Sequence, residues 1–152
     1  MGDMDHNHRL LEWHLLNGQQ LDRLDRARTV VWVSISPLEV HGPHLPLGTD
    51  FLEAEALGQR TAERLVAAHD DLRFVHLPPL YTAADVLPHP GSVRFRCSTI
   101  HRVVADLGRS LAAQGFRHIW VLSFHGGPRH FVPIEMAAHR TNRRYGTSMV
   151  SV

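Results

Sequence analysis

A run of seven residues, 29–35, constrains the fold more than any other stretch of this chain. It reads Thr-Val-Val-Trp-Val-Ser-Ile, so apolar and β-branched side chains occupy nearly every position and do not alternate with polar ones. Successive side chains of a strand point to opposite faces of its sheet. This strand must therefore be covered on both faces, which is typical of a parallel sheet with helices on each side.

Further apolar runs and amphipathic stretches alternate along the rest of the chain. The apolar runs predict strands at 72–77, 117–124 and 148–152. The amphipathic stretches predict helices that begin at Asp50, Ser98 and Arg129 and end near residues 69, 114 and 145. Asp50 with Glu53 resembles a capping box, and Ser98 is expected to cap its helix. Strands alternating with helices predict an α/β fold with a mainly parallel sheet.

Residues 1–28 are polar and are expected to be helical, with Asn17 and Gly18 separating two short leucine stripes. Residues 29–152 are expected to form the α/β unit. A chain of 152 residues is the length of a single domain.

The charge and cysteine content exclude several classes of protein. The net charge is only +1, and no long basic run is present, so we expect neither a nucleic-acid nor a membrane partner. Cys97 is the sole cysteine, so no internal disulfide can form. No apolar run is long enough to span a bilayer, and the polar N-terminus does not resemble a signal peptide. These features favour a cytoplasmic protein.

Two polar segments each follow a predicted strand. The first motif, residues 38–50, holds two histidines and two acidic residues among prolines and glycines. The second motif, residues 123–128, reads Ser-Phe-His-Gly-Gly-Pro. In open α/β sheets, ligands bind beyond the carboxyl ends of the strands. We therefore expect the two motifs to meet in space.

The residue types in these motifs predict a metal site. Glu39 and His41 are two residues apart, so in extended backbone both project to the same side and can bind one ion or two adjacent ions. Asp50 can offer two oxygens, and His125 can add an imidazole from the second motif. Such mixed ligands suit Zn²⁺, Mn²⁺ or Fe²⁺. A carboxylate that bridges two ions places them about 3.5–4 Å apart.

Simpler interpretations remain open for the same residues. Asp50 can be only a helix cap, and His44 can be a hydrogen-bonding loop residue. His125 precedes two glycines and can simply occupy a tight turn.

The motifs also resemble those of a known family. The first closely resembles the signature of the creatininase family, the creatinine amidohydrolases and their relatives, over Glu39-Val40-His41-Gly42-Pro43-His44-Leu45-Pro46-Leu47-Gly48-Thr49-Asp50. The second resembles the Asn-Gly-His-Gly-Gly-Asn signature, with Ser123 and Pro128 in place of the asparagines. The resemblance spans roughly residues 29–152.

The resemblance implies a three-layer α/β/α sandwich and a metal-dependent hydrolase of amide-type C–N bonds. Substrates would be cyclic amides, formamides or small peptide-like molecules, and some relatives trim peptides during cofactor maturation. It implies Glu39, Asp50 and His125 as ligands of one metal, and His41 with a bridging Asp50 as ligands of the other. Zinc or manganese is expected, with iron as a further option; one site is expected to be filled and the second is uncertain.

The remaining site residues and partners follow from the same reading. We expect Ser123, Gly126 and Gly127 to contact the substrate, while the general acid is unassigned. His44, His89 and His130 are weak candidates for that role. The partners expected are a small amide substrate and further copies of the chain, because family members commonly form homo-oligomers.

One departure leaves a second function open. Family members continue into a C-terminal part with a His-Ala-Gly-Glu-like motif, and residues 129–152 contain no match to it. The chain is then either a fragment of a longer protein or a shortened relative. The alternative to an enzyme is a truncated or degenerate, non-catalytic family member that keeps its metal site for structure or for assembly.

Overall fold

The computed structural model describes residues 9–152 and contains a parallel sheet in the order β1-β3-β2-β4-β5. The strands span Leu10–Glu12 (β1), Thr29–Ser34 (β2), Arg73–His76 (β3), His118–Leu122 (β4) and Ser148–Ser151 (β5). β2 lies at the centre, where Val31 is in register with Val75 of β3 and with Ile119 of β4. The predicted parallel sheet is confirmed.

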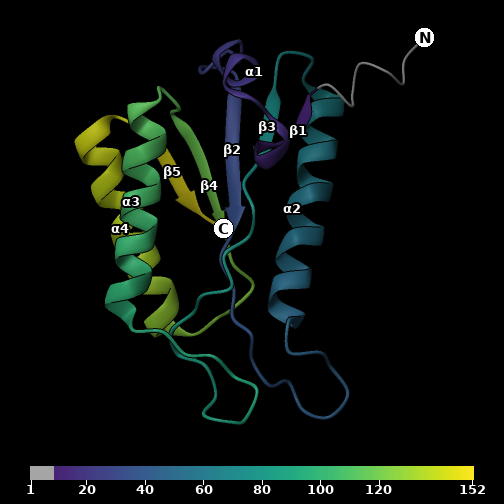
Figure 1. Ribbon diagram of the computed structural model, residues 1–152, viewed down its shortest axis with the longest axis vertical. Coiled ribbons are helices and arrows are strands. Elements are labelled where there is room, and N and C mark those ends of the chain that lie inside the picture. Colours follow the sequence, from purple (N-terminus) through teal and green to yellow (C-terminus); the bar gives the residue numbers. More distant parts are fainter. Residues whose placement is uncertain (1–8) are drawn as a thin grey trace.

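Helices cover both faces of this sheet, which gives the expected three-layer α/β/α arrangement (Figure 1). α2 (Thr49–Ala68) lies on one face, and α3 (Cys97–Ala113) and α4 (Pro128–Tyr145) lie together on the other. β2 alternates between the two layers. Val30 and Trp32 pack in the cluster under α2, whereas Val31 and Val33 pack in the larger cluster under α3 and α4. The burial of all six residues of β2 explains its uninterrupted apolar sequence.

The helical expectation for the N-terminal segment is wrong for its central part. Leu10–Glu12 forms β1, which pairs with β3, and a single 3₁₀ turn (η1, Trp13–Leu15) follows. Within residues 9–28, only α1 (Gly18–Asp22) is α-helical, and Asn17 and Gln20 close its N-terminus with a capping box. Backbone hydrogen bonds to β3 stabilise these residues as an edge strand. This stabilisation outweighs the weak helical pattern of the leucines. Residues 1–8 lie outside the described part of the chain.

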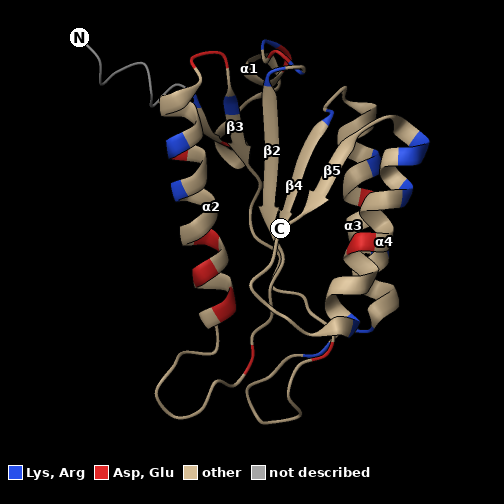
Figure 2. Cartoon of the chain, turned by 180° about the vertical axis from the view of Figure 1, so that it is seen from behind, with Lys and Arg blue, Asp and Glu red and all other residues tan. Residues whose placement is uncertain are grey.

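Two predicted helix caps are also corrected. Gly48, not Asp50, occupies the N-cap position of α2, and no side chain caps that helix. Arg96, not Ser98, is the N-cap residue of α3. Along α2, acidic residues lie mainly toward its N-terminal end and basic residues toward its C-terminal end (Figure 2). Within residues 9–152, no helix has both the length and the apolar character needed to cross a membrane.

α2 packs closely against β2 through a glycine. Gly58 of α2 faces the ring of Trp32, and a Cβ atom at this glycine would lie 2.5 Å from the Trp32 ring. Real Cβ contacts are essentially never this short, so only glycine allows α2 to approach β2 at this point.

The variant Gly58→Val should therefore destabilise the protein. Overpacking of a core contact costs about 1–3 kcal/mol of the free energy of unfolding. Urea denaturation measures this loss, with Ala67→Val as the control because Ala67 is exposed on the same helix. Equal midpoints for the two variants would contradict the close-packing argument.

Candidate metal centre

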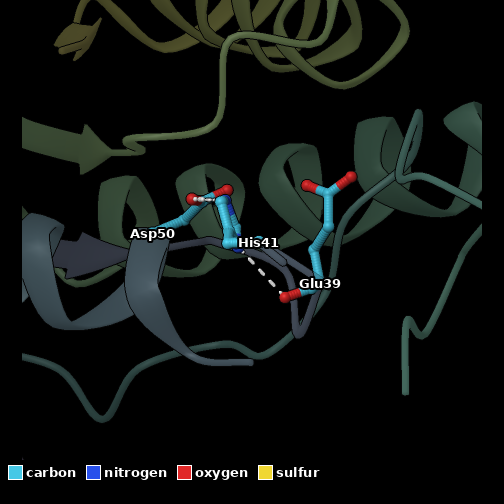
Figure 3. Close-up of side chains that lie close together, drawn as sticks. All are labelled: Glu39, His41 and Asp50. Atoms are coloured by element: carbon cyan, nitrogen blue, oxygen red, sulfur yellow. Dashed lines mark hydrogen bonds and ion pairs between the residues drawn. The ribbon is translucent and has the colours of Figure 1, made fainter. Parts of the chain in front are cut away.

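The two motifs meet at the carboxyl ends of β2 and β4, as the sequence predicts. Glu39 lies beyond β2, Asp50 lies in the first turn of α2, and His125 lies in the connection from β4 to α4. All three side chains are buried, and His41 is half-buried beside them. Ligand atoms of Glu39, His41 and Asp50 all lie within 4.8 Å of one another (Figure 3).

Asp50 joins the two histidines through its two carboxylate oxygens. Its Oδ1 lies 2.8 Å from Nε2 of His41, and its Oδ2 lies 3.0 Å from Nδ1 of His125. Glu39 Oε2 lies 3.2 Å from the same His125 nitrogen. The four residues therefore form one continuous cluster. Asp50 lies at its centre, with His41 on one side and with Glu39 and His125 on the other.

Backbone carbonyl groups fix the orientation of both imidazoles. Nδ1 of His41 lies 3.0 Å from the Glu39 carbonyl oxygen, the contact drawn in Figure 3. Nε2 of His125 lies 3.2 Å from the Ala84 carbonyl oxygen. A carbonyl oxygen only accepts hydrogen bonds, so each of these nitrogens carries the proton. The other ring nitrogen of each histidine faces a carboxylate, and it offers a lone pair there when the imidazole carries only one proton.

Two arrangements satisfy these contacts. Either each imidazole carries a second proton that it donates to the carboxylate, or a metal ion is bound by the ring nitrogens and the carboxylate oxygens. Metal-binding histidines typically donate their other N–H to a backbone carbonyl or a carboxylate, as both histidines do here. The donor set of two imidazoles and two carboxylates suits a first-row divalent ion. The residues therefore fit a metal.

The long loop of residues 80–97 closes one side of the site. The backbone N–H of Leu87 donates to Oε1 of Glu39, which leaves Oε2 directed at His125. Ser92 Oγ accepts from the Val40 N–H at 3.1 Å, and the Val93 N–H donates to the Leu38 carbonyl oxygen at 2.9 Å. These contacts involve backbone atoms, so the length of the loop was the only signal for them in the sequence.

His130 supports the site from beneath and has no access to a substrate. It is fully buried, and its ring meets that of His125 edge-on with centroids 5.3 Å apart. Burial lowers the pKa of His130 to about 4, so its imidazole is neutral near pH 7. It accepts from the Ala84 N–H at 3.4 Å and donates to the Ile35 carbonyl oxygen at 3.2 Å. These contacts tie the ends of β2 and β4 to the loop.

The other predicted site residues have different surroundings. His44 and His89 are exposed, and the His89 ring lies 2.9 Å from the neighbouring Pro90 carbonyl oxygen. Ser123 Oγ accepts from the His125 N–H at 3.3 Å and lies 3.2 Å from His130, so its hydroxyl group positions the second motif.

The two glycines of the second motif differ in the space around them. A Cβ at Gly127 would lie 2.8 Å from His125 Nε2 and 2.9 Å from the Asp85 Cβ, so this position needs glycine. Gly126 has no heavy atom within 4 Å of such a Cβ and faces open space.

A second polar cluster lies between α2 and the sheet. His76 lies 3.0 Å from Glu12 through Nδ1 and 3.1 Å from Glu55 through Nε2, and its ring stacks on Trp32. Burial alone would lower the pKa of His76, but the hydrogen bonds and negative charges of Glu55 and Glu12 raise it above the usual 6.5. Sequence analysis did not identify this cluster because its members come from three separate elements.

A charged His76 should stabilise the protein most at low pH. Its folded-state pKa is above the unfolded-state value, so its contribution is complete below that value and is lost as pH rises through the folded-state pKa. His76→Gln should therefore be less stable than wild type at about pH 5.5, and the difference should shrink at about pH 9. Urea denaturation at both pH values measures the difference, and an unchanged difference would contradict the assignment.

Metal binding should stabilise the fold. An ion that binds only the native state at about 100 times its dissociation constant adds about 2.7 kcal/mol to the free energy of unfolding. Thermal unfolding with Zn²⁺ or Mn²⁺ should show this gain in wild type and in Asp22→Asn, whose carboxylate is exposed. Asp50→Asn should lose most of it; an equal gain in both variants would place the ion elsewhere.

Comparison with known families agrees with the sequence resemblance. The family model for creatininase, described as creatinine amidohydrolase, matches residues 14–152. The mycofactocin precursor peptide peptidase of Mycolicibacterium smegmatis is 32% identical over 99 residues, which cover 64% of this chain and 40% of that protein.

Solved structures of creatininases share this fold. A crystal structure of creatinine amidohydrolase (creatininase) matches with a TM-score of 0.79 at 22% identity, covering 93% of this chain and 57% of that chain. A creatininase structure named for Mn gives a TM-score of 0.77 at the same identity and coverage. A creatininase variant of Zn-Zn type and one complexed with creatine give 0.75 and 0.76, each at 20% identity and the same coverage. This chain therefore spans little more than half the length of those proteins.

Proposed function

The chain belongs to the creatininase family, and on that basis we propose that it is a metal-dependent amidohydrolase. Its reaction would be hydrolysis of an amide-type C–N bond in a cyclic amide, a formamide or a small peptide-like substrate. The observation that carries the proposal is the pair of oriented histidines, each of which holds a ring nitrogen 2.8–3.0 Å from an oxygen of the buried Asp50 carboxylate.

Two sets of ligands are proposed within this cluster. Glu39, Asp50 and His125 would hold one ion, and His41 with the second oxygen of Asp50 would hold another. This division is supported by Asp50, whose Oδ1 faces His41 while its Oδ2 faces His125. The proposed metal is Zn²⁺ or Mn²⁺, with Fe²⁺ as a further option, because related structures are named for manganese and for zinc.

The chain's own residues prepare the site for such chemistry. A divalent ion held there supplies Lewis acidity toward a water molecule and an amide carbonyl group. The Leu87 N–H fixes the Glu39 carboxylate, and the Ala84 carbonyl fixes the tautomer of His125. Gly127 leaves room for His125 to remain in this position. Gly126, which faces open space, is the proposed substrate contact in the second motif, with Ser123 positioning the motif.

The identity of the general acid depends on access to the substrate. His130 is fully buried and neutral, so we do not assign it that role. His44 lies within the first motif and His89 within the loop of residues 80–97; both are exposed, and either remains a candidate. The substrate is proposed to be a small molecule, because one related structure was crystallised with creatine. Assembly into a homo-oligomer is proposed from the family resemblance.

A non-catalytic role is the second candidate. The observation that favours it is within the second motif, where Pro128 occupies a position that carries asparagine in the family signature. In that case the metal would serve structure or assembly, and the same four ligands would be retained without hydrolysis.

Hydrolysis assays distinguish the two candidates. Wild-type protein loaded with Zn²⁺ or Mn²⁺ should hydrolyse at least one of creatinine, formamide or a small cyclic amide. His125→Ala should lower kcat by about 100-fold or more, because even residues that only support a metal ligand typically contribute 10–100-fold. His139→Ala is the matched control, since His139 is exposed on α4.

Two outcomes would contradict the proposed reaction at this site. Absence of hydrolysis in metal-loaded wild type, with metal binding intact, would favour the non-catalytic role. Equal rates for His125→Ala and His139→Ala would exclude the proposed centre as the site of reaction.

A further inference from the structure

A pocket of about 270 Å³ lies where the loop of residues 80–97 meets the starts of α3 and α4. Three arginines line it: Arg94 from the loop, Arg96 at the start of α3 and Arg129 in the first turn of α4. Basic segments lie close together at this end of the two helices (Figure 2). The three arginines therefore come from two parts of the chain, residues 94–96 and the first turn of α4, to one cavity.

These arginines are not neutralised by the protein itself. Among residues 9–152, no ion pair or hydrogen bond connects any of the three guanidinium groups to another side chain or to the backbone. Asp85 is the one acidic residue of the pocket, and its carboxylate accepts a hydrogen bond of 3.1 Å from the Arg129 backbone N–H. The lining is therefore net positive. Several uncompensated arginines around one cavity favour an anion.

The start of α3 adds to this positive potential. α3 has 17 residues, and its N-cap residue, Arg96, makes no side-chain cap hydrogen bond. The free N–H groups of a first helical turn attract negative charge. α4 differs, because the Asp85 carboxylate already occupies its N-terminus. The helix end and the arginines thus favour the same kind of ligand at α3.

The pocket shares a wall with the candidate metal centre. Ala84 and Asp85 both line it, and the Ala84 carbonyl oxygen is the group that orients His125. Asp85 also packs against Gly127, and its backbone has a positive φ of 66°. A non-glycine residue in this conformation is uncommon and is maintained by its surroundings. Ala84 and Asp85 therefore line the pocket and also contact the segment that holds His125.

We propose that this pocket binds the carboxylate or phosphate group of an anionic ligand, and that the ligand is the amide substrate of the neighbouring metal centre. The first statement rests on the arginines and the cavity alone, whereas the second rests also on the proposed hydrolase function. The arginines would then act in substrate specificity. The guanidinium groups suit planar oxyanions because each can donate two parallel hydrogen bonds.

Calorimetric titration tests the anion site without relying on catalysis. Acetate and inorganic phosphate are titrated into wild type and into the double variant Arg96→Ala/Arg129→Ala. The control is Arg60→Ala/Arg64→Ala, which removes the same charge from exposed positions on α2. Wild type and control should bind at least one of the two anions, and the pocket variant should bind it about tenfold more weakly or worse. No binding by wild type, or equal binding by all three proteins, would overturn the proposal.

A second measurement tests whether the anionic group belongs to the amide substrate or to a free anion. Hydrolysis rates are compared for amides that bear a free carboxylate, amides that bear a phosphate group, and neutral amides of the same size. Wild type should prefer one charged form in kcat/KM by about tenfold, and the pocket variant should lose that preference. Anion binding without any such preference would overturn the substrate assignment and indicate a free anion as the ligand. Absence of hydrolysis with every amide would contradict the hydrolase function, while the titration would still decide the anion site.

Discussion

Two buried carboxylates placed against two imidazole rings are the constraint on which the rest of this structure depends. Burial of charged groups is costly unless they are paired, and Asp50 lies within 3.0 Å of both histidines, where protonated imidazoles or a metal ion can pair with it. The fold supplies the means to hold these groups together. Glu39 lies in the segment after β2, Asp50 in the first turn of α2, and His125 in the segment after β4. The parallel sheet places all three residues beyond the carboxyl ends of its central strands. The loop of residues 80–97 fixes the orientation of Glu39 and His125 with backbone hydrogen bonds.

The sheet and its main helices could be predicted because their patterns are long and local. The continuous β-branched run of β2 allowed only a strand covered on both faces, and the structure buries every one of its residues. The N-terminal segment was harder, because the three residues of β1 are stabilised by pairing with β3, more than 60 positions away in the sequence. No pattern of so few residues distinguishes such an edge strand from a helical turn. Gly48 as the N-cap of α2 was missed for a related reason: Asp50 had the residue type of a cap but serves the site instead.

The four proposed ligands could be predicted because they belong to compact motifs, whereas the groups around them could not. Ala84 and Leu87 act through a carbonyl and an amide group that every residue, or nearly every residue, possesses. His130 was visible as a histidine, but only the structure shows that it is buried and supports His125 from beneath. The arginine pocket joins Arg94, Arg96 and Arg129, which are distant or unremarkable in sequence and meet only where two helices begin. The ligands within short motifs could thus be predicted from the sequence, whereas contacts between separate segments became evident only in the structure.

The most direct test of the central claim is an anomalous-difference map from crystals of the wild-type protein grown with Zn²⁺ or Mn²⁺. The account predicts a peak bounded by Glu39, Asp50 and His125, and a second peak, if the other site fills, between His41 and Asp50. Both ions would have only nitrogen and oxygen ligands from these side chains. A map with no peak at these residues, or with peaks only at exposed histidines such as His139, would contradict the account.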